Sequence, residues 1–480
     1  MKTCNGFLIG IFLIGCGVIS LKGQDVYIII PESNIYNRTE FNTIQNVLNT
    51  RNHQSWRIGF LAPIWPEIKS TSGNNFIHNT LAGAFLSTIV LEWQLKSIGG
   101  QNAPFRNQDT LPPYKSFSTN SQYWYQPNST TGNYTPGDVS FNFKIPSNKF
   151  KDYTYHAGEY SINVTHNYGR SGFYTIEFTP DNFKVILKVP AFINWFSTTS
   201  TKYIEVSSLN DYRNVSGQIT SDLANTEFGN TVDFNLWAKA SSVNIQFVSS
   251  KGASGTRNIS NIKLGSAGPE LTTKSITNTS EKFSPTAFGV KTGNRNNFIP
   301  QLSISASDFK TNFFEAGTYT FQLNLEAKST DNYISKLQNT DVTLKVRPLS
   351  EINIPNTGQT VDFNFNTSAQ YANGQAKVVP KQLKISNNES FELYVKSDEN
   401  YFKKGGVQTP INSNILQIGI DGNALTPLST TAKKIITGGT PVLDKELDIK
   451  YEIPPDGAQT LVGYDKATYS INVYYSFTAI

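Results

Sequence analysis

The side chains that most often carry out chemistry in proteins are sparse in this sequence. Its four histidines are His53, His78, His156 and His166, and no two of them lie within five residues of each other. Zinc sites usually draw ligands from closely spaced pairs, so this spacing indicates no metal centre. The sequence also has no Gly-x-Ser-x-Gly turn, phosphate-binding loop or dinucleotide-binding fingerprint. We therefore expect no metal, no cofactor and no enzymatic activity.

Two further segments have polar side chains of catalytic or metal-binding type, but both are typical of turns. Ser171 lies between glycines in the segment 169–172, and no supporting motif accompanies it. Asp421-Gly422-Asn423 lacks the spaced carboxylates of a calcium loop and is expected to form a hairpin turn. Carboxylate pairs that cleave glycosides meet only in space, and the sequence favours no particular pair. A secreted carbohydrate-binding or carbohydrate-active protein therefore stays open as an alternative.

Aromatic residues are the best candidates for a binding surface. Tyr123, Trp124 and Tyr125 lie between a Ser/Thr/Asn-rich stretch and a Pro/Asn/Ser-rich stretch, so we expect them on a loop. An exposed aromatic ring can stack on a sugar or bind an apolar partner. The expected ligand is a surface glycan or a protein. The alternative is that these rings belong to a core.

Composition limits the class of protein. The chain of 480 residues is 38% hydrophobic, 16% charged and 12% aromatic, with a formal net charge of +5. This composition excludes a highly charged disordered chain, and the length suits about three domains. The basic residues form no long cluster, so the charge does not indicate nucleic acid as a partner.

The N-terminus is typical of an export signal. Lys2 precedes an uncharged, mostly apolar run at 7–21, which is too short to span a bilayer as a helix. We expect residues 1–23 to be a signal peptide and the mature protein to reach the cell surface or the extracellular space. The segment 13–16 resembles a bacterial lipobox, so a lipid anchor on Cys16 is an alternative.

A phrase containing a tyrosine recurs three times along the chain. It spans residues 156–164, 315–323 and 466–473, and its equivalent tyrosines are Tyr160, Tyr319 and Tyr469. The five residues that start at the first and at the third tyrosine are identical. Because the copies are about 150 residues apart, which is the size of a domain, the repeat predicts three modules of one fold.

A second phrase is a β-rich run closed by proline, and it also occurs three times, at 25–31, 183–190 and 341–348. Proline cannot donate to a continuing ladder, so each run is typical of one strand. If each run is the first strand of its own module, a signal peptide at 1–23 precedes modules at 24–181, 182–340 and 341–480. The alternative is that the later two runs complete the preceding module, which leaves the last module without a strand and the run at 25–31 free.

Hydrophobic residues alternate with polar residues at a period of two in several segments, including 139–145, 232–236, 361–365 and 447–453. This period indicates half-buried strands, and no long segment has the period of a helix. Turn clusters separate the strands about every ten residues. The sequence therefore predicts an all-β fold of three tandem antiparallel β-sandwich modules.

The tyrosine phrase resembles the tyrosine corner of immunoglobulin-like domains, in which the tyrosine hydroxyl bonds to backbone upstream. Bacterial cell-surface proteins often string such modules in tandem, and the resemblance implies immunoglobulin-like sandwiches in this chain. The strand at 469–480 is similar to the closing strand of fimbrial pilins, which lack a last strand and receive one from a neighbouring subunit. That resemblance implies a subunit that self-associates head to tail by strand exchange.

These features predict a non-enzymatic, exported protein with a structural and adhesive role. Four of the six tryptophans lie in the first third of the chain, which is also the most divergent of the three units. We expect this first module to be the binding end of a β-sandwich rod. The polymerising fimbrial subunit and the carbohydrate-binding or carbohydrate-active protein are the two alternatives.

Overall fold

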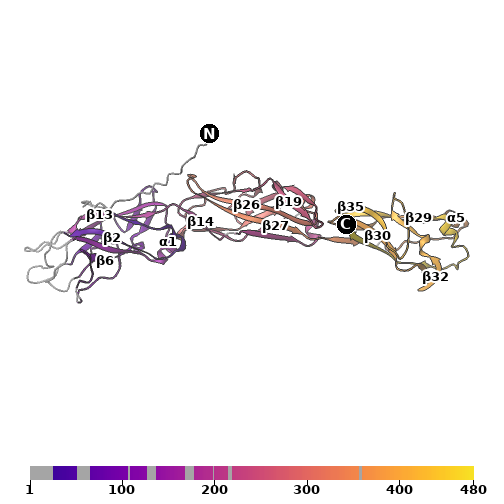
Figure 1. Ribbon diagram of the computed structural model, residues 1–480, viewed down its shortest axis with the longest axis horizontal. Coiled ribbons are helices and arrows are strands. Elements are labelled where there is room, and N and C mark those ends of the chain that lie inside the picture. The colour runs from indigo at the N-terminus through magenta and orange to yellow at the C-terminus, as the bar shows by residue number, and fades with distance from the viewer. Residues whose placement is uncertain are drawn as a thin grey trace, which may run out of the picture.

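A computed structural model gives the fold, and it describes residues 25–50, 65–105, 107, 109–126, 137–167, 178–197, 199–214, 219–355 and 359–480. These residues form an elongated rod of three β-rich bodies that lie end to end in sequence order (Figure 1). The longest helix of the described residues, α4 (Ala306–Asn312), has only seven residues. The predicted all-β sandwich class is confirmed.

Each body has an apolar core of its own. The buried apolar residues fall into three separate clusters that follow one another along the chain. On this basis we call residues 25–192 the first module, 193–347 the second module and 348–480 the third module. Packing of two sheets against such a core removes each large apolar side chain from water, at about 1.5–3 kcal/mol apiece.

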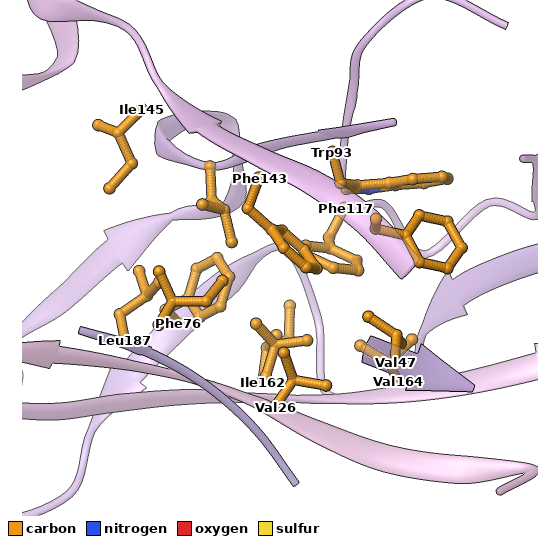
Figure 2. Packing of buried hydrophobic residues seen from close by; sticks show 14 of the residues in the cluster. Val26, Val47, Phe76, Trp93, Phe117, Phe143, Ile145, Ile162, Val164 and Leu187 are labelled. Atoms are coloured by element: carbon orange, nitrogen blue, oxygen red, sulfur yellow. The ribbon is translucent and has the colours of Figure 1, made fainter. Parts of the chain in front are cut away.

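The first module is a sandwich of two sheets. One sheet contains β1 (Val26–Ile29), β13 (Asn182–Val189), β11 (Gly158–Asn167), β3 (Glu67–Ser70), β9 (Gln122–Tyr123), β4 (Asn75–His78) and β5 (Phe85–Ser87). The other contains β12 (Phe178–Thr179), β2 (Phe41–Thr50), β10 (Gly137–Ile145), β6 (Glu92–Ile98), β7 (Gln101–Asn102) and β8 (Lys115–Ser116). The helical turns are α1 (Glu32–Asn37), η1 (Thr88–Val90) and α2 (Ser147–Asp152). Figure 2 shows the core between the two sheets, where Val26 and Leu187 face Trp93 and Phe143.

The second module has one large sheet, as the first has, and two smaller ones. Its largest sheet contains β15 (Thr201–Val206), β27 (Ser335–Val346), β26 (Gly317–Ser329), β18 (Phe234–Ala240), β23 (Glu281–Lys282), β19 (Asn244–Ser249) and β20 (Ser254–Asn258). Two smaller sheets contain β14 (Ile193–Ser197), β17 (Thr226–Asn230) and β24 (Arg295–Phe298), and β16 (Ile219–Asp222), β25 (Pro300–Ile304), β21 (Ile262–Ser266) and β22 (Lys274–Ser275). Besides α4, the helical turns are α3 (Asn210–Arg213), η2 (Ile259–Asn261) and η3 (Thr292–Asn294).

The third module has three sheets. They contain β28 (Ser350–Asn353), β29 (Gln375–Asn387), β36 (Val442–Ile453), β33 (Gln417–Ile420) and β34 (Thr426–Pro427); β35 (Lys433–Gly439), β30 (Phe391–Ser397) and β38 (Val473–Ala479); and β32 (Val407–Asn412), β31 (Tyr401–Lys404) and β37 (Tyr469–Ser470). The helical turns are α5 (Ser368–Asn373), η5 (Ser413–Ile415) and α6 (Pro455–Gln459). The predicted turn at 421–423 is confirmed, because it joins the antiparallel strands β33 and β34.

The later two proline-closed runs complete the module that precedes them. The run at 183–190 forms β13, which pairs antiparallel with β11 of the first module, and the run at 341–348 lies largely in β27, which pairs antiparallel with β26 of the second. The expectation that each run opens its own module is wrong for these two. The predicted boundaries at 181/182 and 340/341 cut off a strand that the preceding core needs, because its inward side chains are buried in that core.

Candidate functional site

The three tyrosines of the repeated phrase form the same corner. The Tyr160 hydroxyl oxygen accepts a hydrogen bond of 2.8 Å from the His156 backbone N–H. The hydroxyls of Tyr319 and Tyr469 donate to the backbone carbonyls of Glu315 and Asp465, at 2.8 Å and 3.0 Å. In each case the partner lies four residues upstream, so the hydroxyl ties the entry of the strand to the turn before it. The strands β11, β26 and β37–β38 are therefore equivalent.

In the first two modules this equivalent strand has a neighbour on each side. In the first module, β3 and β4 pair with one edge of β11, and β13 pairs with the other edge from Gly158 to Thr165. Beyond β13 lies β1, which runs parallel to it. In the second module β18 and β19 pair with one edge of β26, β27 pairs with the other, and β15 runs parallel to β27.

In the third module one edge of this strand is open. β30 pairs with β38 and β31 pairs with β37 on the side where the other modules have β3–β4 and β18–β19. On the opposite side no strand of the described residues pairs with β38. That edge presents unpaired backbone N–H and C=O groups, which are a template for the addition of another strand.

The apolar side chains beside the open edge are partly exposed. They are Ile471, Val473, Tyr475 and Phe477, which pack against the third core and reach solvent as well. The matching residues at the second and fourth positions after the corner of the first module, Ile162 and Val164, are buried. The missing neighbour explains the difference, because a strand at that edge would cover the same side chains.

The segment 359–366 is the counterpart in the third module of the strands that flank β13 and β27 in the first two. It lies before α5, as β1 lies before α1 and β15 before α3. Val361, Phe363 and Phe365 pack against the third core and are partly exposed. The sequence predicts a strand here, and that prediction is wrong: the segment joins no sheet of the described chain. Its counterparts are strands because β13 and β27 pair with them.

The first two modules show what such a gap holds. β13 directs Phe183, Val185, Leu187 and Val189 into the first core, and all four are buried. β27 directs Val342, Leu344 and Val346 into the second core in the same way. By comparison with these two modules, the open edge of β38 matches an extended segment with an apolar residue at every second position that runs antiparallel to β38.

The aromatic residues singled out for binding are divided between core and surface. Trp124 and Tyr125 are each 1% exposed, so the expected loop exposure is wrong for both. The Trp124 ring packs 5.6 Å from Phe141, and the Tyr125 hydroxyl donates to Asp109 at 2.5 Å. Both rings are part of the first core, where burial removes a large apolar surface from water.

Tyr123 alone lies at the surface, where it is 36% exposed and contacts Trp65 edge to face at 5.1 Å. Next to it is a shallow depression of about 440 Å³, lined by Asn74, Ser87, Thr88, Ile89, Lys115, Ser116, Phe117, Ser118 and Gln122. The ammonium group of Lys115 donates to the Tyr123 carbonyl at 2.9 Å, and burial lowers the pKa of this lysine. Hydroxyl, amide and aromatic groups of this kind can bind a sugar.

The residues considered for other chemistry have structural positions. His78 Nε2 lies 3.0 Å from the Ala157 carbonyl, and its Nδ1 accepts from the backbone N–H of Leu81 at 3.0 Å. Burial lowers the pKa of His166 to about 3. In the described ranges no three His, Cys, Asp or Glu side chains gather as a metal site, and no helix is long and apolar enough to cross a membrane. His53, Ser171, Cys16 and the predicted signal peptide at 1–23 lie outside the described residues.

Sequence comparison gives no relatives: no family model and no curated protein matches this chain. Several solved structures of fimbrial proteins share limited similarity. The CooA pilin subunit of enterotoxigenic Escherichia coli is 12% identical, with 32% of this chain and 99% of that chain covered and a TM-score of 0.23.

The CFA/I adhesin CfaE of the same bacterium is 11% identical, with coverages of 69% and 99% and a TM-score of 0.28. The CsuC–CsuE chaperone–tip adhesion subunit complex of Acinetobacter baumannii is 11% identical, with coverages of 59% and 99% and a TM-score of 0.28. TM-scores this low do not establish a common overall arrangement, so no function is transferred from these proteins.

Proposed function

We propose that this chain is an exported, non-enzymatic surface adhesion protein whose third module is completed by a strand from a second polypeptide. The observation that carries the proposal is the open edge of β38, seen against the filled edges of β11 and β26. Addition of a strand would satisfy the unpaired backbone groups and cover the partly exposed apolar side chains at once. The rod would then be one unit of a longer surface assembly.

We propose that β1 of another copy of this chain is not the strand that completes the third module. The alternative interpretation of the sequence leaves residues 25–31 free to complete another molecule, but β1 pairs along its whole length with β13. Val26 and Ile28 are buried in the first core. Withdrawal of β1 would expose both side chains, so this segment is a poor donor. We therefore propose a heterologous partner segment instead of head-to-tail self-association through β1.

The strands β13 and β27, which complete the first and second modules within this chain, indicate what the partner segment needs. It needs an apolar side chain at every second position over about seven residues, as in β13 and β27. It enters antiparallel to β38, so its first residues lie near the second module and its last residues lie near the free end of the rod. Ladder hydrogen bonds supply affinity, and the alternating apolar residues supply the register.

A synthetic peptide with the sequence of residues 335–348 tests this proposal on the full-length chain. We expect the labelled peptide to bind, and we expect amide hydrogen exchange to slow in β38 and in the segment 359–366. The control peptide has serine in place of Val342, Leu344 and Val346, which keeps the backbone and removes the apolar face. Absence of binding by the first peptide, or equal binding by both, would contradict the proposal.

A second candidate function, binding of a surface glycan by the first module, is favoured by the depression beside Tyr123. Tyr123→Ala removes the exposed ring and Trp124→Phe alters a buried one, so a glycan array probed with both variants separates recognition from folding. We expect the first variant to lose its glycan signal while the melting temperature is kept. An unchanged glycan profile for Tyr123→Ala would exclude this surface.

A further inference from the structure

The two junctions between modules use one hydrogen-bonding pattern. At the first junction, Thr231 lies in the turn before β18 and forms hydrogen bonds with the segment that follows β13. Its hydroxyl accepts from the Phe192 N–H at 2.9 Å and donates to the Pro190 carbonyl at 2.7 Å. Its backbone N–H donates to the Phe192 carbonyl at 3.1 Å. One side chain and one amide thus fix the path of the connecting segment.

Asn388 does the same at the second junction. It lies in the turn before β30, the strand equivalent to β18, and its side-chain oxygen accepts from the Leu349 N–H at 2.7 Å. Its side-chain amide donates to the Arg347 carbonyl at 2.8 Å, and its backbone N–H donates to the Leu349 carbonyl at 3.1 Å. The two residues that Asn388 contacts, Arg347 and Leu349, are two positions apart, as Pro190 and Phe192 are at the first junction. The pattern is the same although threonine and asparagine differ in shape.

A fourth hydrogen bond ties this turn to the tyrosine corner of the preceding module. The carbonyl of Thr231 accepts from the Ala157 N–H at 2.8 Å, and the carbonyl of Asn388 accepts from the Ala316 N–H at 2.9 Å. Both alanines lie three residues before the corner tyrosine of their module. We call the four bonds together the junction clamp. Because it recurs with different side chains, the clamp is a property of how one module of this fold seats on the next.

The third module has the corner position of this clamp, one of its four donors, at the free end of the rod. Lys466 lies three residues before Tyr469, at the position of the two alanines, and it is exposed. Around it are Val407 and Val462, which are 71% and 66% exposed, and the partly exposed ring of Tyr464. A depression of about 350 Å³ adjoins them and is lined by Lys404, Gln408, Asp465, Tyr469 and their neighbours.

Val407 is the first residue of β32, which lies at the far end of the rod (Figure 1). We call the surface around Val407, Val462, Tyr464 and Lys466 the end face. The last residues of an added strand would lie there too, because β13 and β27 both run antiparallel to their partners and leave their modules at the corner end. In the first two modules the chain that leaves at this point continues directly into another module. The end face is thus the surface that the next module covers elsewhere in the molecule.

We propose that the end face, formed by Val407, Val462, Tyr464 and Lys466, is a docking surface for a β-sandwich module that directly follows the added strand in the partner polypeptide. The Lys466 N–H donates to the carbonyl of a threonine or asparagine in the turn of that module, which completes a third junction clamp. This inference rests on the proposed strand addition and goes beyond it. The partner is then more than a peptide: it is a strand joined without a long linker to a module of this fold.

Two extended forms of the full-length chain test the inference. The first carries a copy of residues 330–349 after Ile480, which supplies the turn, the β27 strand and the first connecting residues. The second carries a copy of residues 330–480, which supplies the same strand followed by a whole module. Amide hydrogen exchange is measured at β38 and at the end face in both forms and in the chain without an extension.

We expect slower exchange in β38 for both extended forms, and slower exchange around Tyr464 and Lys466 for the longer form alone. Protection of β38 in both forms without protection of the end face in the longer one would overturn the docking surface and leave strand addition standing. Lack of protection of β38 in both forms would overturn strand addition itself. The two failures are therefore distinguishable.

Substitutions on the end face sharpen the test. In the longer form, Tyr464→Glu in the original third module should speed exchange at Lys466 of that module by at least tenfold, because a charge replaces an apolar contact, while exchange in β38 of that module stays slow. Val243→Glu, at an exposed apolar residue on the second module, is the matched control and should change neither. Asn388→Ala in the appended copy alone should have the same effect as Tyr464→Glu, and an unchanged exchange rate in both variants would contradict the clamp.

Discussion

The first and third modules contain the same five residues in opposite surroundings. Tyr-Ser-Ile-Asn-Val occupies 160–164 in β11 and 469–473 across β37 and β38. Val164 is 1% exposed because β13 lies beside it, whereas Val473 is partly exposed beside an open edge. Since the local sequence is identical, the difference comes from the neighbouring strand. Completion of a sandwich is therefore a separate event from formation of its individual strands.

The largest effect is expected where a completing strand already fills its gap. Leu344 of β27 is buried and Leu337 of the same strand is exposed. Leu344→Asp places an unpaired charge in the second core and should cost more than about 4 kcal/mol of unfolding free energy. Leu337→Asp should cost less than about 0.5 kcal/mol. Denaturant unfolding of the full chain measures both, and equal losses would show that β27 does not complete the second core.

Cavity-forming substitutions should separate the filled gap from the open one. Leu187→Ala removes a fully buried side chain of β13 and should cost about 3 kcal/mol. Phe477→Ala removes a side chain that is already partly exposed, so its cost should be about 1 kcal/mol, a small fraction of the value for a buried phenylalanine. Hydrogen exchange that resolves each module gives the two values. The cost of Phe477→Ala should rise when the peptide with the sequence of residues 335–348 is bound. An unchanged cost would argue against the peptide covering Phe477.

A pH difference between the modules is expected from His166, which occupies β11 six residues after the corner. Burial lowers its pKa from 6.5 to about 3, so the folded first module holds the neutral ring. The free energy of unfolding of the first module is at its full value above pH 6.5, where the ring is neutral in both the folded and the unfolded state. It falls as the pH drops toward 3, by about 2 kcal/mol at pH 5, because the unfolded state takes up a proton that the folded state does not. His166→Leu, which installs the residue type of Leu325 at the same position of β26, should remove this dependence. An acid response that survives the substitution would assign it to other groups.

The smallest effect is expected at the corners. Tyr319→Phe leaves the Glu315 carbonyl without its donor in a mostly buried corner and should cost about 1 kcal/mol. Tyr469→Phe removes an equivalent bond that lies in an exposed position, where water can replace the hydroxyl, so it should cost less than about 0.5 kcal/mol. Thermal unfolding followed module by module compares them. A larger cost for the exposed corner would mean that the third module depends on its corner more than the second does.

Parts of the candidate site could be predicted from residues close together in sequence. The corner hydrogen bonds of Tyr160, Tyr319 and Tyr469 follow from a phrase of a few residues, and the turn at 421–423 follows from its Asp-Gly-Asn composition. The position of Trp124 did not follow in the same way. A short aromatic run between polar stretches is compatible with a loop or with a core strand, and only packing against Phe141 decides between them.

The alternation of polar and apolar residues by itself determined that this protein is built of strands, and the repeated tyrosine phrase determined that one unit occurs three times. Only the tertiary structure decided which module owns each proline-closed run, and hence that the third module has an open edge. The physical reason is that ladder hydrogen bonds join backbone groups, which every residue except proline provides alike. The backbone of a strand such as 183–190 could pair with the module that precedes it in sequence or with the module that follows it. Burial of its apolar side chains in one of the two cores decides between them.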